Sequence, residues 1–200
     1  MTIQKSYPYI LIIGSIIGLA ASFLLTLDTI KLIQNPVADI PCNINPFISC
    51  GNAAISWQGH VFGFPNSILG LVAFSMLLAV GVMLFSGGRA KKPLWLLANL
   101  GLLTAVAFVI WFIYESLYSL GSLCVYCMII WAVIWPLFLY TTVWNFKEEH
   151  FILSSLKTKT QNKIDMIMNF ISRNYIQILI IWYLIILLLI LFQFKDFFFN

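Results

Sequence analysis

Five apolar stretches, each about twenty residues long, dominate this chain, and they constrain its fold more than any other feature. They cover residues 8–27, 64–86, 93–117, 123–143 and 176–194. A helix of about 20 apolar residues crosses a hydrocarbon layer about 30 Å thick and satisfies its own backbone hydrogen bonds there. With 62% hydrophobic and 9% charged residues, a soluble domain is excluded. The sequence predicts an all-α integral membrane protein.

The basic residues are unevenly distributed along the chain. If the five spans alternate in direction, nine of the 11 basic residues fall on one side of the membrane, leaving Lys31 and Lys195 for the other. The nine are Lys5, Arg89, Lys91, Lys92, Lys147, Lys157, Lys159, Lys163 and Arg173. Basic loops face the cytoplasm. The amino terminus is therefore predicted to be cytoplasmic and all four cysteines extracytoplasmic, and the basic residues indicate a membrane partner rather than nucleic acid.

The four cysteines form two pairs. Cys124 and Cys127 are a C-x-x-C pair at the start of the fourth apolar stretch, and Cys42 and Cys50 lie in the first extracytoplasmic loop. On a helix, Cys124 and Cys127 share one face, with the first sulfur at the membrane surface near the helix amino terminus, which favours a thiolate. Two dithiols on the oxidising side suggest a relay by thiol–disulfide exchange from a soluble thiol to a lipid-borne acceptor such as a quinone.

Other interpretations of the cysteines remain open at this point. The two pairs would also suit structural disulfides, although a C-x-x-C bridge closes too small a loop to stabilise much. Cys42 and Cys50 are too far apart in sequence for a zinc knuckle, so no metal site is predicted. A transporter or thiol sensor is a further hypothesis, but a transporter needs polar groups at mid-membrane, and these spans hold few beyond Ser75 and Thr104.

Three motifs in fixed order resemble the vitamin K epoxide reductase family. They are the pair Cys42 and Cys50, the stretch PNSILG at residues 65–70, and the stretch CVYC at residues 124–127. The resemblance covers residues 10–140 and implies a four-helix bundle around a quinone, with the fifth span outside it. The other class of quinone-linked disulfide-generating proteins, the DsbB type, carries its C-x-x-C pair in the first outer loop, which is the reverse order.

The resemblance implies a catalytic role for each cysteine. A reduced partner protein would attack the loop disulfide at Cys42, and Cys50 would then exchange with Cys124 through a transient bridge. Cys127, deeper in the bundle, would reduce the quinone, either ubiquinone or menaquinone. Some bacterial relatives continue past the fifth span into a thioredoxin-like domain. None follows here, so a separate thioredoxin-like (DsbA-type) partner is expected.

The resemblance also implies three quinone-binding residues. Asn66 matches an asparagine that hydrogen-bonds a quinone carbonyl, Ser56 matches a serine near the active site, and Trp131 stands where vertebrate members carry a tyrosine. Each has a plainer alternative: a helix cap for Asn66, an ordinary loop hydroxyl for Ser56 and a lipid-facing side chain for Trp131. Without the tyrosine hydroxyl, the sequence does not predict reduction of vitamin K epoxide itself.

The predicted organisation has three parts. Residues 1–145 form the catalytic domain, residues 146–174 an amphipathic cytoplasmic linker, and residues 175–200 the fifth span with a short outer tail. Two short surface helices are expected, over residues 28–35 and near Ala53. The sequence thus predicts a disulfide-generating oxidoreductase of the bacterial inner membrane.

Overall fold

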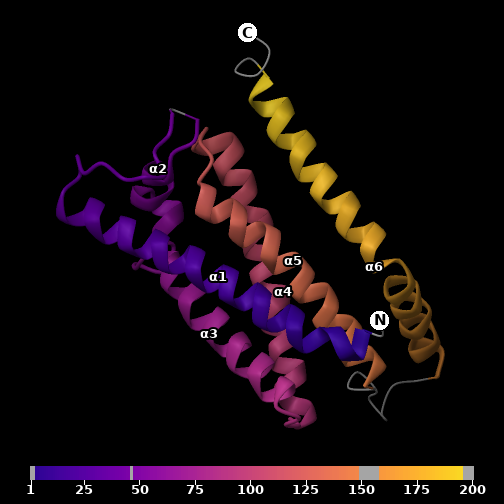
Figure 1. Ribbon diagram of the computed structural model, residues 1–200. Coiled ribbons are helices and arrows are strands. Elements are labelled where there is room, and N and C mark those ends of the chain that lie inside the picture. The colour runs from indigo at the N-terminus through magenta and orange to yellow at the C-terminus, as the bar shows by residue number, and fades with distance from the viewer. Residues whose placement is uncertain (1–2, 46, 149–157, 196–200) are drawn as a thin grey trace.

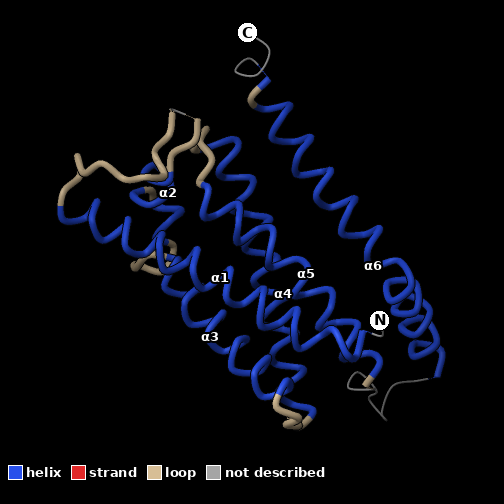
Figure 2. Tube along the Cα trace, viewed as in Figure 1, coloured by secondary structure: helices blue, strands red, loops and turns tan. Residues whose placement is uncertain are grey.

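The computed structural model describes residues 3–45, 47–148 and 158–195, which are mostly helical (Figures 1 and 2). The α-helices are α1 (Ile3–Gln34), α2 (Cys50–Ile55), α3 (Asn66–Phe85), α4 (Lys92–Tyr114), α5 (Val125–Lys147) and α6 (Thr158–Gln193). A 3-10 helix, η1 (Trp57–His60), follows α2, and a π-helical turn, η2 (Glu115–Ser119), continues α4. Five of these helices are long and apolar enough to cross a membrane.

Helices α1, α3, α4 and α5 form a bundle, and α6 packs outside it (Figure 1). Helix α1 contacts both α3 and α5 along its length, α4 contacts α5, and α6 contacts α5. Small residues bring α1 and α3 together, because Gly18 faces the ring of Phe74 and Gly70 faces Ser22 with no room for a side chain. The predicted all-α membrane fold, a four-helix bundle with a fifth spanning helix, is confirmed.

Helical structure forms at both places where a surface helix was predicted, but near Ala53 the helix, α2, buries the side chains of Ala53 and Ala54. Residues 28–35 do not form a separate helix, because α1 continues to Gln34 and ends only before Pro36, the first residue that cannot extend it. Helix α2 begins at Cys50, where the Ser49 hydroxyl caps it by accepting the Asn52 N–H at 3.3 Å. The second cysteine of the loop is therefore held at the first turn of a helix.

The predicted linker and tail are covered only in part. Residues 149–157 and 196–200 lie outside the described residues, while α6 already begins at Thr158 and changes direction at Asn174, whose backbone is not helical. The division of the chain into catalytic domain, linker and fifth span stays a prediction.

The end of α1, the loop before α2 and the start of α5 meet at one end of the bundle (Figure 1), and the last two of these segments carry the four cysteines. The turn between α3 and α4, which carries Arg89 and Lys91, lies at the opposite end. The bundle therefore separates its cysteines from this basic turn along its long axis.

Candidate active site

The first cysteine pair is closed as a disulfide in the loop before α2. Cys42 and Cys50 are bonded, with their Cα atoms 5.5 Å apart. The Asn45 carboxamide oxygen accepts backbone N–H groups of residues 47 and 48, and the Asn43 carboxamide oxygen accepts the Ser49 hydroxyl and the Gly51 N–H. These side-chain-to-backbone bonds fold the loop locally.

The same loop pairs with the segment that precedes the C-x-x-C motif. Leu123 donates its N–H to the Phe47 carbonyl at 2.7 Å and accepts the Ser49 N–H at 3.0 Å. This short parallel bridge joins residues 75 positions apart in the chain. Since Leu123 directly precedes Cys124, the bridge sets the loop disulfide over the start of α5.

Three sulfur atoms are thereby brought together. The Sγ atoms of Cys42, Cys50 and Cys124 all lie within 4.8 Å of one another. Cys50 and Cys124 are completely buried, and Cys42 retains 5% of its accessible surface. A free thiol beside a disulfide at this separation needs only a small movement to attack it. Cys42 is thus the most accessible sulfur-bearing residue of the three.

The second cysteine pair is a dithiol at the amino terminus of α5. Cys124 is the N-cap residue, and its Sγ accepts the Cys127 N–H at 3.3 Å. A hydrogen bond from the Cys127 thiol lowers the pKa of the Cys124 thiol. Burial of Cys124 raises this pKa, and the backbone N–H groups of residues 126 and 127 lower it, so that the net pKa is below its usual value. The docked loop covers Cys124 completely, and its position at the level of the membrane surface stays a prediction.

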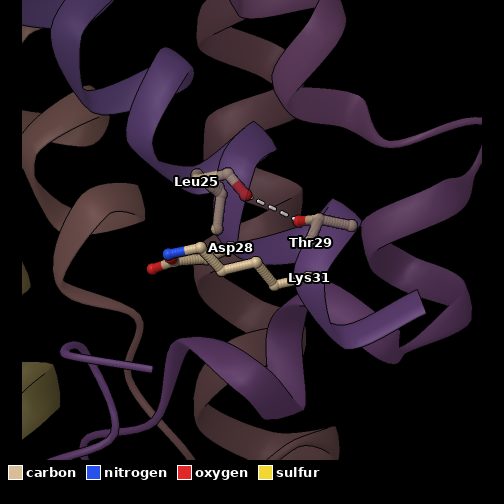
Figure 3. Close-up of polar contacts among 4 residues, drawn as sticks. All are labelled: Leu25, Asp28, Thr29 and Lys31. Carbon is tan, nitrogen blue, oxygen red and sulfur yellow. Dashed lines mark hydrogen bonds and ion pairs between the residues drawn. The ribbon is translucent and has the colours of Figure 1, made fainter. Parts of the chain in front are cut away.

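A buried carboxylate lies near this dithiol. Asp28, near the carboxyl end of α1, is 4% exposed, and its Oδ1 is 3.7 Å from the Lys31 ammonium, while its Oδ2 accepts no hydrogen bond within the part of the chain that the structure describes. Figure 3 shows this ion pair beside Thr29, whose hydroxyl donates to the Leu25 carbonyl. The negative charge of Asp28 raises the pKa of the Cys124 thiol and so partly opposes the hydrogen bonds at the helix amino terminus.

A cavity of about 300 Å³ opens beside Cys127. Its walls come from α1, α2, η1, α3, α4 and α5, and α6 contributes none of its lining residues. Most lining side chains are apolar, and the aromatic ones are Phe62, Phe74, Phe108, Phe112 and Trp131. Such a volume and lining suit a flat, oily ligand of moderate size. The dithiol therefore links the loop disulfide on one side to an apolar cavity on the other.

Asn66 lies in the cavity wall and does not cap its own helix. Its Nδ2 donates to the Gln58 carbonyl at 2.6 Å, and its Oδ1 accepts the Val61 N–H at 3.2 Å. The amide carries two N–H groups, and the bond to Gln58 uses one of them. The Gln58 side chain in turn donates to Glu115 at 3.0 Å. This network fixes the Asn66 amide at the cavity wall.

The other two residues predicted to bind the quinone differ in their placement. Trp131 lines the cavity and is 3% exposed, so its side chain packs inside the bundle and does not face lipid. Ser56 is not among the lining residues, and its hydroxyl donates to the Ala53 carbonyl and accepts the Gly59 N–H as the cap of η1. The arrangement therefore unites Asn66, Trp131 and Cys127 at one cavity, with Ser56 outside it.

Several residues of the site were not predicted from the sequence. The rings of Phe74, Phe108 and Phe112 line the cavity, and the bridging side chain of Gln58 is 5% exposed. The phenylalanines look like any others in apolar spans. Among these residues, only Asp28 could have been identified from the sequence, because an acidic side chain directly after the first apolar stretch is unusual.

A buried dithiol that touches a loop disulfide at one end of a membrane helix bundle defines a membrane thiol–disulfide oxidoreductase. The chain belongs to the vitamin K epoxide reductase family, whose family model matches residues 9–142. Comparison with curated proteins gives no match. The family match agrees with the resemblance drawn from the three sequence motifs. It begins within α1, ends within α5 and does not reach α6.

Proposed function

We propose that this protein oxidises a thioredoxin-like partner and passes the two electrons through its cysteine pairs to a membrane quinone. The observation that carries the proposal is the position of Cys124. Its sulfur lies within 4.8 Å of both loop cysteines, while its partner Cys127 lines the apolar cavity. The Cys124–Cys127 dithiol thus lies next to the loop disulfide, which would deliver electrons, and next to the apolar cavity, where a quinone would accept them.

The proposed relay consists of balanced two-electron exchanges. A partner dithiol attacks the loop disulfide at Cys42, the less buried of the two bonded cysteines, and leaves as a disulfide while Cys42 and Cys50 become thiols. The Cys50 thiolate then attacks Cys124 of an oxidised Cys124–Cys127 pair, and Cys42 resolves the resulting bridge. The loop disulfide is restored and the dithiol of α5 is reduced, which is the combination of one disulfide and two free thiols seen here.

The residues at the cavity fit a quinone. Asn66 would hold a carbonyl oxygen through its second amide N–H, Trp131 would stack against the ring, and Cys127 would face it from the wall. A quinone bound there supplies a two-electron, two-proton acceptor. The lowered pKa of the Cys124 thiol favours its thiolate. This thiolate would form the disulfide with Cys127 as the two electrons pass to the quinone.

The proposed orientation places the cysteines outside the cytoplasm of a bacterial inner membrane. Two observations support it. The turn with Arg89 and Lys91 lies at the end of the bundle opposite the cysteines, as expected for a cytoplasmic face. The disulfide between Cys42 and Cys50 also persists best in an oxidising compartment. The partner would then be an extracytoplasmic protein with a reactive dithiol.

The exchange step is tested by keeping one thiol from each pair. In the double variant Cys42→Ala/Cys127→Ala, only Cys50 and Cys124 remain. We expect them to form one intramolecular disulfide rapidly on mild oxidation, because their sulfurs already lie within 4.8 Å. The linked peptides are measured by mass spectrometry after the remaining thiols are alkylated.

The matched control is the double variant Cys50→Ala/Cys124→Ala, which keeps Cys42 and Cys127. Cys127 is not part of the three-sulfur cluster. Cys42 and Cys127 should therefore stay as free thiols under the same oxidising conditions and be recovered in alkylated form. Equal bridging in the two variants, or none in either, would contradict the proposed exchange between Cys50 and Cys124.

A further inference from the structure

Helix α6 makes no contribution to the cavity, yet one residue just beyond its end is buried. Among the described side chains from residue 165 to residue 195, only Met168 and Phe194 are buried. Phe194 is 6% exposed, whereas Phe192, two residues earlier, is 71% exposed. A helix whose described side chains are mostly exposed is therefore followed by one aromatic ring that packs into the protein.

Two side chains attach α6 to α5 at mid-span. Trp182 stacks on Trp135 with ring centroids 4.1 Å apart and planes 12° from parallel. The Tyr183 hydroxyl donates to the Ala132 carbonyl at 2.6 Å. Proline at position 136 has no N–H to offer the carbonyl four residues earlier, so Tyr183 satisfies a backbone group that Pro136 leaves unpaired. This specific attachment fixes where the end of α6 lies.

The ring of Phe194 contacts the redox loop directly. It meets the ring of Phe47 edge-to-face, with centroids 5.7 Å apart and an interplanar angle of 79°. Phe47 lies between the two loop cysteines, and its carbonyl accepts the N–H of Leu123, the residue before Cys124. The end of α6 thus presses on the segment that carries the loop disulfide to the α5 dithiol.

We infer that α6 is a clamp for the redox loop, with Phe194 acting as a positioning residue that holds Phe47 and so keeps Cys50 docked on Cys124. The inference rests on the proposed relay and assigns a role to the fifth spanning helix. It predicts that loss of the aromatic contact lowers the docked fraction of the loop without changing the cavity.

The test uses the Cys42→Ala/Cys127→Ala background, in which bridging of Cys50 to Cys124 reports loop docking without any quinone or partner. Adding Phe194→Ala should slow bridging by about two- to tenfold, the effect of losing one edge-to-face aromatic contact. Phe192→Ala is the matched control, because it removes the same side chain from the exposed face of the same helix, and it should leave the bridging rate unchanged.

A second readout separates positioning from general loss of structure. In a Cys42→Ala/Cys50→Ala variant, Phe194→Ala should speed alkylation of Cys124 several-fold, because an undocked loop uncovers this completely buried residue. Phe47→Ala should reproduce both effects, and the Phe47→Ala/Phe194→Ala combination should add nothing further, since both changes remove one contact.

Some results would overturn the clamp. Bridging in the Phe194→Ala variant as fast as in the Phe192→Ala variant would do so, as would additive effects of Phe47→Ala and Phe194→Ala. These outcomes are independent of the proposed function. A protein that reduces no quinone could still show the docking difference, and a working relay could still be indifferent to Phe194.

Discussion

Replacing Cys127 with alanine is expected to stop quinone reduction with every thiol donor, protein or small molecule. Cys127 is the only cysteine that lines the cavity, so all routes for electrons converge on it. The loss should be on the order of 10⁵-fold, because a positioned reactive group is replaced by thiols in free solution. Quinone absorbance, followed with the purified protein in detergent, measures the rate.

The control for this variant is Cys127→Ser, which keeps the size and a hydrogen-bond donor but has no redox chemistry. It should be as inactive as Cys127→Ala. If either variant reduces quinone at more than a small fraction of the wild-type rate, Cys127 does not deliver the electrons and the cavity has another role.

Replacing Cys42 with alanine should stop oxidation of a thioredoxin-like protein while sparing some turnover with a small dithiol. The protein donor cannot reach Cys124, which is completely buried beneath the loop, whereas Cys42 keeps some exposure. A small dithiol can enter when the loop opens. The burial of Cys124 means that the spared activity should be a minor fraction of the wild-type rate, measured again from quinone absorbance.

The Cys42→Ala variant leaves Cys50 without its disulfide partner. Cys50, once unpaired, lies within 4.8 Å of Cys124 and can trap it as a stable bridge. The double variant Cys42→Ala/Cys50→Ala removes this trap, so it should accept small dithiols faster than Cys42→Ala while remaining inactive with the protein donor. Equal failure of both variants with both donors would show that the loop pair is not a shuttle.

The sequence predicted the spans and the cysteine motifs because their signals are local. Apolar length alone defines a spanning helix, and the three-residue spacing of Cys124 and Cys127 defines a pair on one helix turn. The start of α3 at Asn66 also follows from its preceding proline. Each of these features is determined by residues that are close together in the sequence, so the local sequence is enough to predict it.

Long-range packing accounts for what the sequence did not predict. The burial of Cys124 depends on the hydrogen bonds between Leu123 and the loop. The hydrophobic periodicity of either segment does not predict that these two segments pair. Likewise, the bonds of the Asn66 amide to η1 replace the helix cap that its position alone suggests. The placement of Ser56 as the cap of η1, outside the cavity, is a result of the same kind.

The most direct test of the relay supplies a reduced, membrane-impermeant thioredoxin-like protein to one face of sealed membrane vesicles and follows the absorbance of their quinone. Vesicles that expose the extracytoplasmic face should reduce their quinone, with one partner disulfide formed for each hydroquinone. Inverted vesicles should remain oxidised until they are permeabilised. Reduction from the cytoplasmic face alone, or no reduction from either face, would contradict the account.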